Sequence, residues 1–392
     1  MMNVLQAVGH ALSIAGLMTW QILWALILGF ALSAIIQALV RRETVVGLLG
    51  DDRPRTLVVA AGVGAASSSC SYASVALART LFMKGANFTA AMTFEIASTN
   101  LVVELGIILA LLLSWQFTLA EFVGGPLMIV MLAVLFRLLL RKRLLDGALA
   151  QAKKGLAGSM EGHAAMDMSV RETGSIWKRL RSPSGFTSVS HVFVMEWAAV
   201  LRDIVGGLLI AGAIAAWVPA SFWRIFFLTE DPLLSKIWGP IVGPLVSVLS
   251  FVCSIGNVPL AAVLWTGGIS FGGVISFIFA DLIILPILLI YRKYYGTKMM
   301  LFLAGTFYVT MVAAGFLVEV IFGVLGLVPT ERSSQVVESH ISLNYTSVLN
   351  VVFLALAGVL LWRFFRTGGR EMLAMMSGAP GGMAGHEEST HE

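Results

Sequence analysis

Charged residues are scarce in this chain, and their scarcity excludes a water-soluble domain. Asp, Glu, Lys and Arg make up 12% of the 392 residues, whereas 58% of the residues are hydrophobic. A typical soluble domain carries about 25% charged residues. Most of the molecular surface must therefore face lipid or protein, so the composition predicts a membrane protein.

Cysteine is nearly absent as well. Cys70 and Cys253 are the two cysteines of the chain, and 183 positions separate them. No CxxC pair exists, which excludes a zinc finger and the usual dithiol redox motif. The phosphate-binding pattern GxxxxGK[ST] is also missing, so ATP could drive this chain only through another subunit. We expect no cofactor.

Long apolar stretches recur along the chain. About 20 apolar residues are enough to span a bilayer as a helix. Nine stretches reach this range: residues 11–40, 56–81, 86–113, 119–140, 191–217, 239–265, 270–290, 299–327 and 345–365. The first is longer than a signal-peptide core and lacks a basic segment before it, so we expect it to remain as a helix. The net charge of +4 comes from Lys and Arg beside these stretches, and no nucleic-acid partner is expected.

The two segments that contain the cysteines resemble each other. When Cys70 is aligned with Cys253, ten of the 35 positions from 70 to 104 are identical without a gap. The identical pairs include Ser71 with Ser254, Gly85 with Gly268, Phe88 with Phe271, Phe94 with Phe277 and Ala97 with Ala280. Transporters are often built from internal repeats, so the match predicts a duplication.

The distribution of Lys and Arg indicates how these segments meet the membrane. If all nine stretches cross, the loop residues divide 12 inside to 12 outside. If segments 56–81 and 239–265 return to the side that they entered, the division becomes 21 to 3. The positive-inside rule therefore favours seven crossings and two re-entrant or broken hairpins. Half-helices of about eleven residues reach roughly 16 Å, which places each hairpin tip near the bilayer midplane.

We therefore expect an all-α polytopic membrane protein with two inverted-topology repeats. Its expected parts are a first membrane repeat (1–140), a cytoplasmic basic loop (141–190), a second membrane repeat (191–330), an additional transmembrane helix (345–366) and a disordered cytoplasmic tail (367–392). The charge division puts the N-terminus outside and the C-terminus in the cytoplasm. The expected location is the plasma membrane of a prokaryote, which is the inner membrane of a Gram-negative cell.

Several motifs carry a resemblance to a known family. They are Cys70-Ser71, Gly85, Ile96-Ala97-Ser98, Asp203 with the run 206–212 before Pro219, Cys253-Ser254, Asn257 and Pro259-Leu260-Ala261. In these motifs the sequence resembles the predicted permease family that includes the organoarsenical efflux permeases. The first motif departs from the family pattern, because Ser67 to Ser69 and Thr99-Asn100 stand where the family carries prolines. The resemblance implies a permease that exports a trivalent organoarsenical.

The cysteines and the polar hairpin tips are the candidate substrate-binding residues. Thiolates select soft ions, so Cys70 and Cys253 suit a trivalent arsenical, Hg(II) or Cu(I), as metal or metalloid ligands. The tips supply further polar candidates: Ser67, Ser68, Ser69, Ser71, Ser254 and Asn257. Two alternatives stay open, namely that the cysteines are small packing residues and that the polar residues cap half-helices.

Carboxylates inside predicted spans are candidates for coupling transport to protons, because charge inside a membrane is costly. Glu95 and Asp281 follow the two cysteine hairpins and are the first choices. Asn100 and Glu104 are also candidates, since a spacing of four places them on one face of a continuous helix. The alternative is that these carboxylates pair with Arg79 or Arg202.

The sequence therefore predicts a secondary-active permease, not an enzyme, with the lipid bilayer and a small-molecule or metalloid substrate as its partners. Assembly into a homo-oligomer is a further possibility that the sequence leaves undecided. One alternative is a permease or channel for another small solute, in which the cysteines are structural. Another is a membrane thiol oxidoreductase, although that chemistry usually requires a neighbouring resolving cysteine.

Overall fold

The computed structural model describes residues 4–39, 49–68, 71–153, 178, 182–250, 254–332 and 345–376. These residues form helices and contain no strand, as the composition predicts for an all-α protein. The first half contains α1 (Val4–Leu39), α3 (Pro54–Ser67), α4 (Ser71–Met83), α5 (Phe88–Asn100), α6 (Val103–Leu112), α7 (Trp115–Leu139) and α8 (Lys142–Ala152). The second half contains α11 (Pro183–Trp217), α12 (Ala220–Phe226), α13 (Pro232–Ser250), α14 (Ser254–Gly267), α15 (Phe271–Phe279), the 3₁₀ helix η1 (Ala280–Ile283), α16 (Leu285–Tyr295) and α17 (Thr297–Val324). Two helices follow, α19 (Tyr345–Arg366) and α20 (Gly369–Met376).

Several of these helices are long and apolar enough to cross a membrane. Five spans qualify without a sharp bend: Phe88–Leu112, which takes α5 and α6 together, Trp115–Leu139, Pro232–Leu249, Thr297–Val324 and Thr346–Arg366. Two bent pairs raise the number to seven: Leu5–Trp20 with Ile22–Leu32, and Phe271–Ile283 with Leu285–Tyr295. Large apolar side chains on these helices face outward, such as Leu138 at 74% and Val324 at 83% exposure. Lipid is the medium that accommodates such a surface, and the chain is a polytopic membrane protein.

The two cysteine segments adopt matching local structure. α4 begins at Ser71 and α14 begins at Ser254, which are aligned positions. Each helix ends in a turn that needs a glycine, because Gly85 and Gly268 have φ values of 104° and 110°. The two turns share their hydrogen bonds: the N–H of each glycine donates to the carbonyl three residues earlier, at 3.1 Å in both. The aligned sequences therefore fold alike in the part that the structure describes.

The first hairpin, formed by α3 and α4, begins and ends at the C-terminal end of α7. The Asn87 N–H, after α4, donates to the Leu49 carbonyl, before α3, over 2.7 Å. Arg137, in the last turn of α7, reaches Asp52 with its Nε atom 2.7 Å from Oδ2. The base of this hairpin is therefore fixed beside the C-terminus of α7.

The loop before α3 stabilises the N-terminus of that helix. The Asp51 carboxylate accepts hydrogen bonds from the Thr56 hydroxyl and from the Arg53 N–H, and these bonds lower the pKa of Asp51. Pro54 occupies the first turn, where its fixed φ suits a helix and its missing N–H costs no helical bond. An anionic side chain beside a helix N-terminus is favourable.

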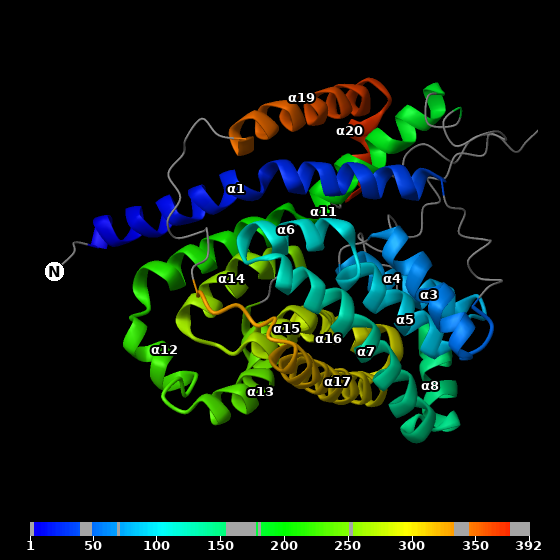
Figure 1. Cartoon of the computed structure of the whole chain (residues 1–392). Helices are drawn as coiled ribbons and strands as arrows, with labels where there is room; N and C mark the ends of the chain where they lie inside the picture. The colour runs from blue at the N-terminus through cyan, green and yellow to red at the C-terminus, as the bar shows by residue number, and fades with distance from the viewer. Residues whose placement is uncertain are drawn as a thin grey trace, which may run out of the picture.

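The second hairpin, formed by α13 and α14, begins and ends at the other end of α7. Thr229, just before α13, lies against Gly268, just after α14. The Trp265 ring near the end of α14 packs on Phe117 in the first turn of α7, with centroids 5.1 Å apart. Figure 1 shows α3 and α4 on one side of α7 and α13 and α14 on the other. The two hairpins thus approach each other from opposite ends of α7.

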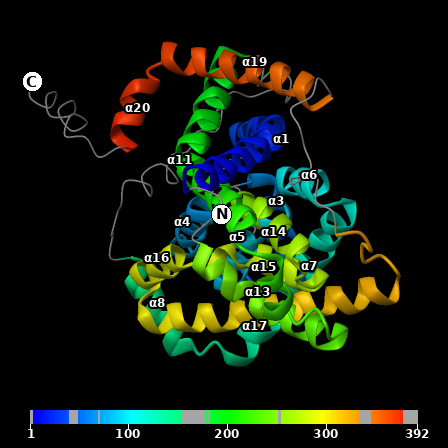
Figure 2. The same cartoon turned by 90° about the vertical axis from the view of Figure 1, so that its left-hand side faces the viewer.

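α1, α11 and α19 pack together as a layer along one side of the remaining helices (Figures 1 and 2). Asn350 of α19 joins this layer to α1: its Nδ2 donates to the Trp20 carbonyl at 2.8 Å, and its Oδ1 accepts from the Trp24 N–H at 2.9 Å. Those two backbone groups would bond to each other in a regular helix. α1 bends by 46° between Trp20 and Ile22, and the inserted side chain accounts for the bend.

Candidate functional site

The two hairpins meet at the serines that begin α4 and α14. Ser71 Oγ and Ser254 Oγ lie 3.5 Å apart, although 183 positions separate them in the chain. Both hydroxyls donate to the same atom, Oδ2 of Asp281, each over 2.6 Å. All three residues are at most 5% exposed. Three of the predicted site residues, one from each of three helices, therefore form one buried polar cluster.

Helix geometry explains why a carboxylate can be ionised at this point. Ser71 and Ser254 are the first residues of their helices, so Asp281 lies beside two helix N-termini. The helix dipole favours negative charge at that end, and hydroxyl hydrogen bonds to a carboxylate are stronger than bonds between neutral groups. These interactions offset part of the cost of burying a carboxylate at Asp281.

A break in the helix places Asp281 at the cluster. α15 ends at Phe279, η1 carries Asp281, and α16 begins at Leu285 after a bend of 41°. Pro286 in the first turn of α16 lacks an N–H, which favours a new helix start there. The carboxyl therefore projects from an interrupted helix.

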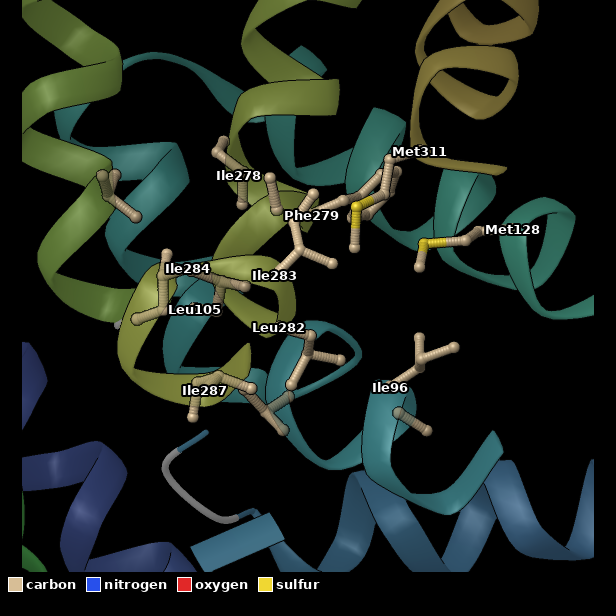
Figure 3. Packing of buried hydrophobic residues seen from close by; sticks show 14 of the residues in the cluster. Ile96, Leu105, Met128, Ile278, Phe279, Leu282, Ile283, Ile284, Ile287 and Met311 are labelled. Carbon is tan, nitrogen blue, oxygen red and sulfur yellow. The ribbon is translucent and has the colours of Figure 1, made fainter. Parts of the chain in front are cut away.

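Apolar side chains enclose this segment. Figure 3 shows Leu282 of η1 packed near Ile96 of α5, and Met128 of α7 lies above them. Each of these three side chains is at most 1% exposed. A charge in such surroundings is expensive unless it is hydrogen-bonded, so the serine donors at Asp281 contribute to the stability of the fold.

Glu95 lies close to the cluster on α5. The Tyr291 hydroxyl of α16 donates to its Oε1, and its Oε2 has no hydrogen-bond partner among the described residues. Glu95 and Asp281 interact electrostatically. The fold thus brings together the two carboxylates that the sequence ranked first for coupling, and it adds Tyr291, which the sequence analysis did not identify.

Asn100 and Glu104 are separated by a break. The expectation that they share one helical face is wrong, because α5 ends at Asn100, Val102 is extended, and α6 begins at Val103. The Thr99 hydroxyl bonds to the carbonyls of Glu95 and Ile96 in its own helix. The Asn100 side chain interacts with Asp281, whereas Glu104 lies against Gly29 of α1.

The remaining polar candidates have structural partners or fall outside the described residues. Ser67 ends α3, and Ser68 follows with φ 35° and donates its N–H to the Gly64 carbonyl at 3.2 Å. Asn257 Nδ2 donates to Ser247 Oγ at 3.1 Å, which ties α14 to α13. Ser69, Cys70 and Cys253 lie outside the described residues.

The arginines named as alternative partners take other positions. Arg79 donates to the Ala152 carbonyl at 2.8 Å and lies 4.4 Å over the Tyr294 ring. Arg202 is exposed. Arg53 pairs with Asp51 and Arg137 pairs with Asp52, in and beside the loop before α3.

A further buried carboxyl was missed by the sequence analysis. Glu121 of α7 is 0% exposed, and it interacts electrostatically with Asp281. Its place within the apolar stretch 119–140 was the available signal. Among the described residues no group of three or more His, Cys, Asp or Glu side chains is arranged to hold a metal ion. The described cluster is suited to binding a small polar solute or a proton.

Comparison with known proteins agrees with this architecture. The family model described as a predicted permease (ArsP_1) matches residues 7–320. The protein named "Putative permease Rv2963" from Mycobacterium tuberculosis (strain ATCC 25618 / H37Rv) is 69% identical over 377 residues, which cover 96% of this chain and 93% of that protein. No solved structure matches this chain. The chain belongs to the predicted permease family and is a membrane permease.

Proposed function

We propose that this permease is a secondary-active transporter whose two halves are inverted-topology repeats, with α3–α4 and α13–α14 as re-entrant hairpins. The observation that carries the proposal is the meeting of Ser71 and Ser254 on one oxygen of Asp281. Two hairpins that approach from opposite ends of α7 and meet inside the molecule resemble the broken helices at transporter midplanes. The proposed membrane orientation puts the Asp52 loop in the cytoplasm.

The proposed substrate is a thiophilic metal or metalloid species, such as a trivalent organoarsenical, which the permease exports. Cys70 and Cys253 directly precede the two serines that meet. We place both thiols at this site as soft ligands, and Asp281 beside them as an anionic group. Membership of a permease family and the family resemblance of the Cys-Ser motifs support this assignment.

Transport into everted membrane vesicles tests the function. The probes are methylarsenite, arsenite, Hg(II), Cu(I) and an unrelated organic anion, supplied to vesicles with and without a pH gradient. We expect saturable uptake of at least one thiophilic probe, faster with the gradient. Flux that does not saturate and that is equal with and without the pH gradient would instead identify a channel.

Two conservative variants test the thiols. Cys70→Ser and Cys253→Ser nearly keep the side-chain volume but remove a soft ligand, so membrane insertion should persist while uptake of the thiophilic probe is lost. Ser276→Ala, which removes a hydroxyl bonded within its own helix, is the control. Full transport by both cysteine variants would show that the cysteines are packing residues.

A further inference from the structure

Glu121 differs from three other buried carboxyls of the described chain, Glu95, Asp281 and Glu319. Neither of its oxygens has a hydrogen-bond partner among the described residues. By contrast, Glu95 accepts from Tyr291, Asp281 accepts from two serines, and Glu319 accepts the Gly272 N–H at 2.6 Å. An ionised carboxylate without donors is far more costly in an apolar interior than a neutral carboxylic acid. In this conformation Glu121 therefore carries a proton.

The position of Glu121 relates it to the two other carboxylates. It lies six residues after Trp115, about 9 Å along α7 from that end. Glu95 lies seven residues after Phe88, about 10 Å along α5, and Phe88 stacks on Phe136 at the opposite end of α7. Asp281 acts electrostatically on both Glu121 and Glu95. The neighbouring residues agree, because Figure 3 shows Leu282, next to Asp281, near Ile96, next to Glu95, and Met128 of α7 above them. The three carboxyls therefore come from neighbouring parts of α5, α7 and η1, and Asp281 is the carboxyl with which both glutamates interact.

We propose that one proton crosses the permease along Glu121, Asp281 and Glu95, and that Glu121 is the protonated end of this path. The proposal rests on the proposed function, because it names the coupling ion of that transporter. In each transfer one carboxyl O–H bond breaks as the O–H bond of the next carboxyl forms, and no other bond changes. Tyr291 is the positioning residue that holds Glu95 at the far end.

Other titratable groups lie on the elements packed against α7. They are Glu95 on α5, Glu104 on α6, Asp281 on η1 after α15, Glu319 on α17 and Asp146 on α8 beyond the end of α7. Asp281 is the charged group that acts on Glu121. A second negative charge beside Asp281 would repel it, which further favours the protonated form of Glu121 when Asp281 is ionised.

Infrared difference spectroscopy of the full-length protein in liposomes tests the proton on Glu121 without any substrate. A protonated carboxylic acid has its own C=O stretch band. We expect Glu121→Gln to remove one such band and Glu121→Asp to shift it. Glu319→Gln is the matched control and should keep the band, because its amide oxygen can still accept from Gly272. An unchanged band in Glu121→Gln would overturn the proposal.

Transport in the same liposomes tests the path. With methylarsenite as probe, Glu121→Gln should lower uptake driven by a pH gradient by about 100-fold or more, the smaller end of the effect of removing a proton-transfer group. Exchange of internal for external probe needs no net proton movement and should stay near the wild-type rate. Retained gradient-driven uptake, or equal loss of both activities, would overturn the path. If the wild type transports no thiophilic probe, the substrate proposal is wrong. The infrared experiment still shows whether Glu121 is protonated.

Discussion

At the scale of single residues, Asp281 connects the two halves of the chain, because its two hydroxyl donors come from different hairpins. Removing either donor leaves a buried carboxylate with fewer hydrogen bonds. We expect Ser71→Ala or Ser254→Ala to cost about 1.5 to 3 kcal/mol of stability, the usual range for a hydrogen bond to a charged group. Thermal unfolding in detergent measures the loss, and probe transport should fall with it.

The control for both serines is Ser276→Ala. This hydroxyl is equally buried but donates to Gly273 of its own helix, so its removal should cost about 1 kcal/mol. If Ser71→Ala is no more destabilising than Ser276→Ala, the Asp281 cluster does not hold the hairpins together.

Tyr291 provides a second residue-scale prediction. Tyr291→Phe removes the donor to Glu95 and leaves that buried carboxyl unsatisfied, so transport should fall and the protein should melt at a lower temperature. Tyr308→Phe is the matched control, because its hydroxyl donates to the Ile241 carbonyl at a half-buried position. Equal effects of the two substitutions on transport would argue against a specific role for Glu95.

The sequence could identify Asp281 and Glu95, because an acidic residue inside an apolar stretch stands out. Glu121 also lies in such a stretch, but it is the third residue of the stretch 119–140, where sequence alone cannot distinguish a buried side chain from an interfacial one. The depth of Glu121 depends on how α7 packs against its neighbours. Tyr291 was not predictable, since its role depends on contact with a residue 196 positions away.

At the scale of elements, the stability cost of adding a side chain can be compared between the glycine turns after α4 and α14. Gly85→Ala places a side chain in open space, so its cost is the backbone strain alone, about 1 to 3 kcal/mol. Gly268→Ala adds a clash, because a Cβ atom there would lie 2.6 Å from Thr229 Cγ2. Melting temperatures should therefore rank the wild type above Gly85→Ala and Gly85→Ala above Gly268→Ala.

Gly147→Ala is the control for this series. Gly147 lies inside α8 with open space around it, and alanine is favoured over glycine in helices by about 1 kcal/mol. This variant should melt at or above the wild-type temperature. A reversed order of Gly85→Ala and Gly268→Ala would mean that Thr229 does not pack on the second turn.

Element breaks were predictable to different degrees. The polar runs at Ser67 to Ser71 and at Ser254 indicated where α3 and α13 give way to the next helices, as the structure confirms for the described residues. No glycine or proline marks the break between Asn100 and Val103, so the sequence predicted one continuous helix there. Neither hydropathy nor a helix-breaking residue type indicates that break, so it depends on tertiary packing.

At the scale of the whole molecule, the topology can be tested by labelling. In a variant with serine at both native cysteine positions, cysteines introduced at Arg55 and Arg292 should be protected from an impermeant maleimide added to intact cells. Lys236→Cys should react. Lys236 is exposed near the start of α13, at the base of the second hairpin, which the proposed topology places outside. Labelling of Arg55→Cys from outside would contradict the proposed orientation.

The Lys and Arg division predicted hairpins that return to their own side. The first hairpin agrees with this prediction, because Leu49 and Asn87, on either side of it, are hydrogen-bonded neighbours. The layer formed by α1, α11 and α19 was not predictable, since apolar surfaces that face lipid and apolar surfaces that face protein have the same composition.

The amide of Asn350 has a consequence for any shortened form of this chain. Because it occupies both backbone groups at Trp20 and Trp24, α1 can close that helical hydrogen bond only when α19 leaves. The hydrogen bond from the Trp24 N–H to the Trp20 carbonyl therefore cannot form in α1 while α19 is packed against it. A chain that stops before Tyr345 would have a straighter first helix, and the angle of α1 against α11 would report whether the C-terminal segment is in place.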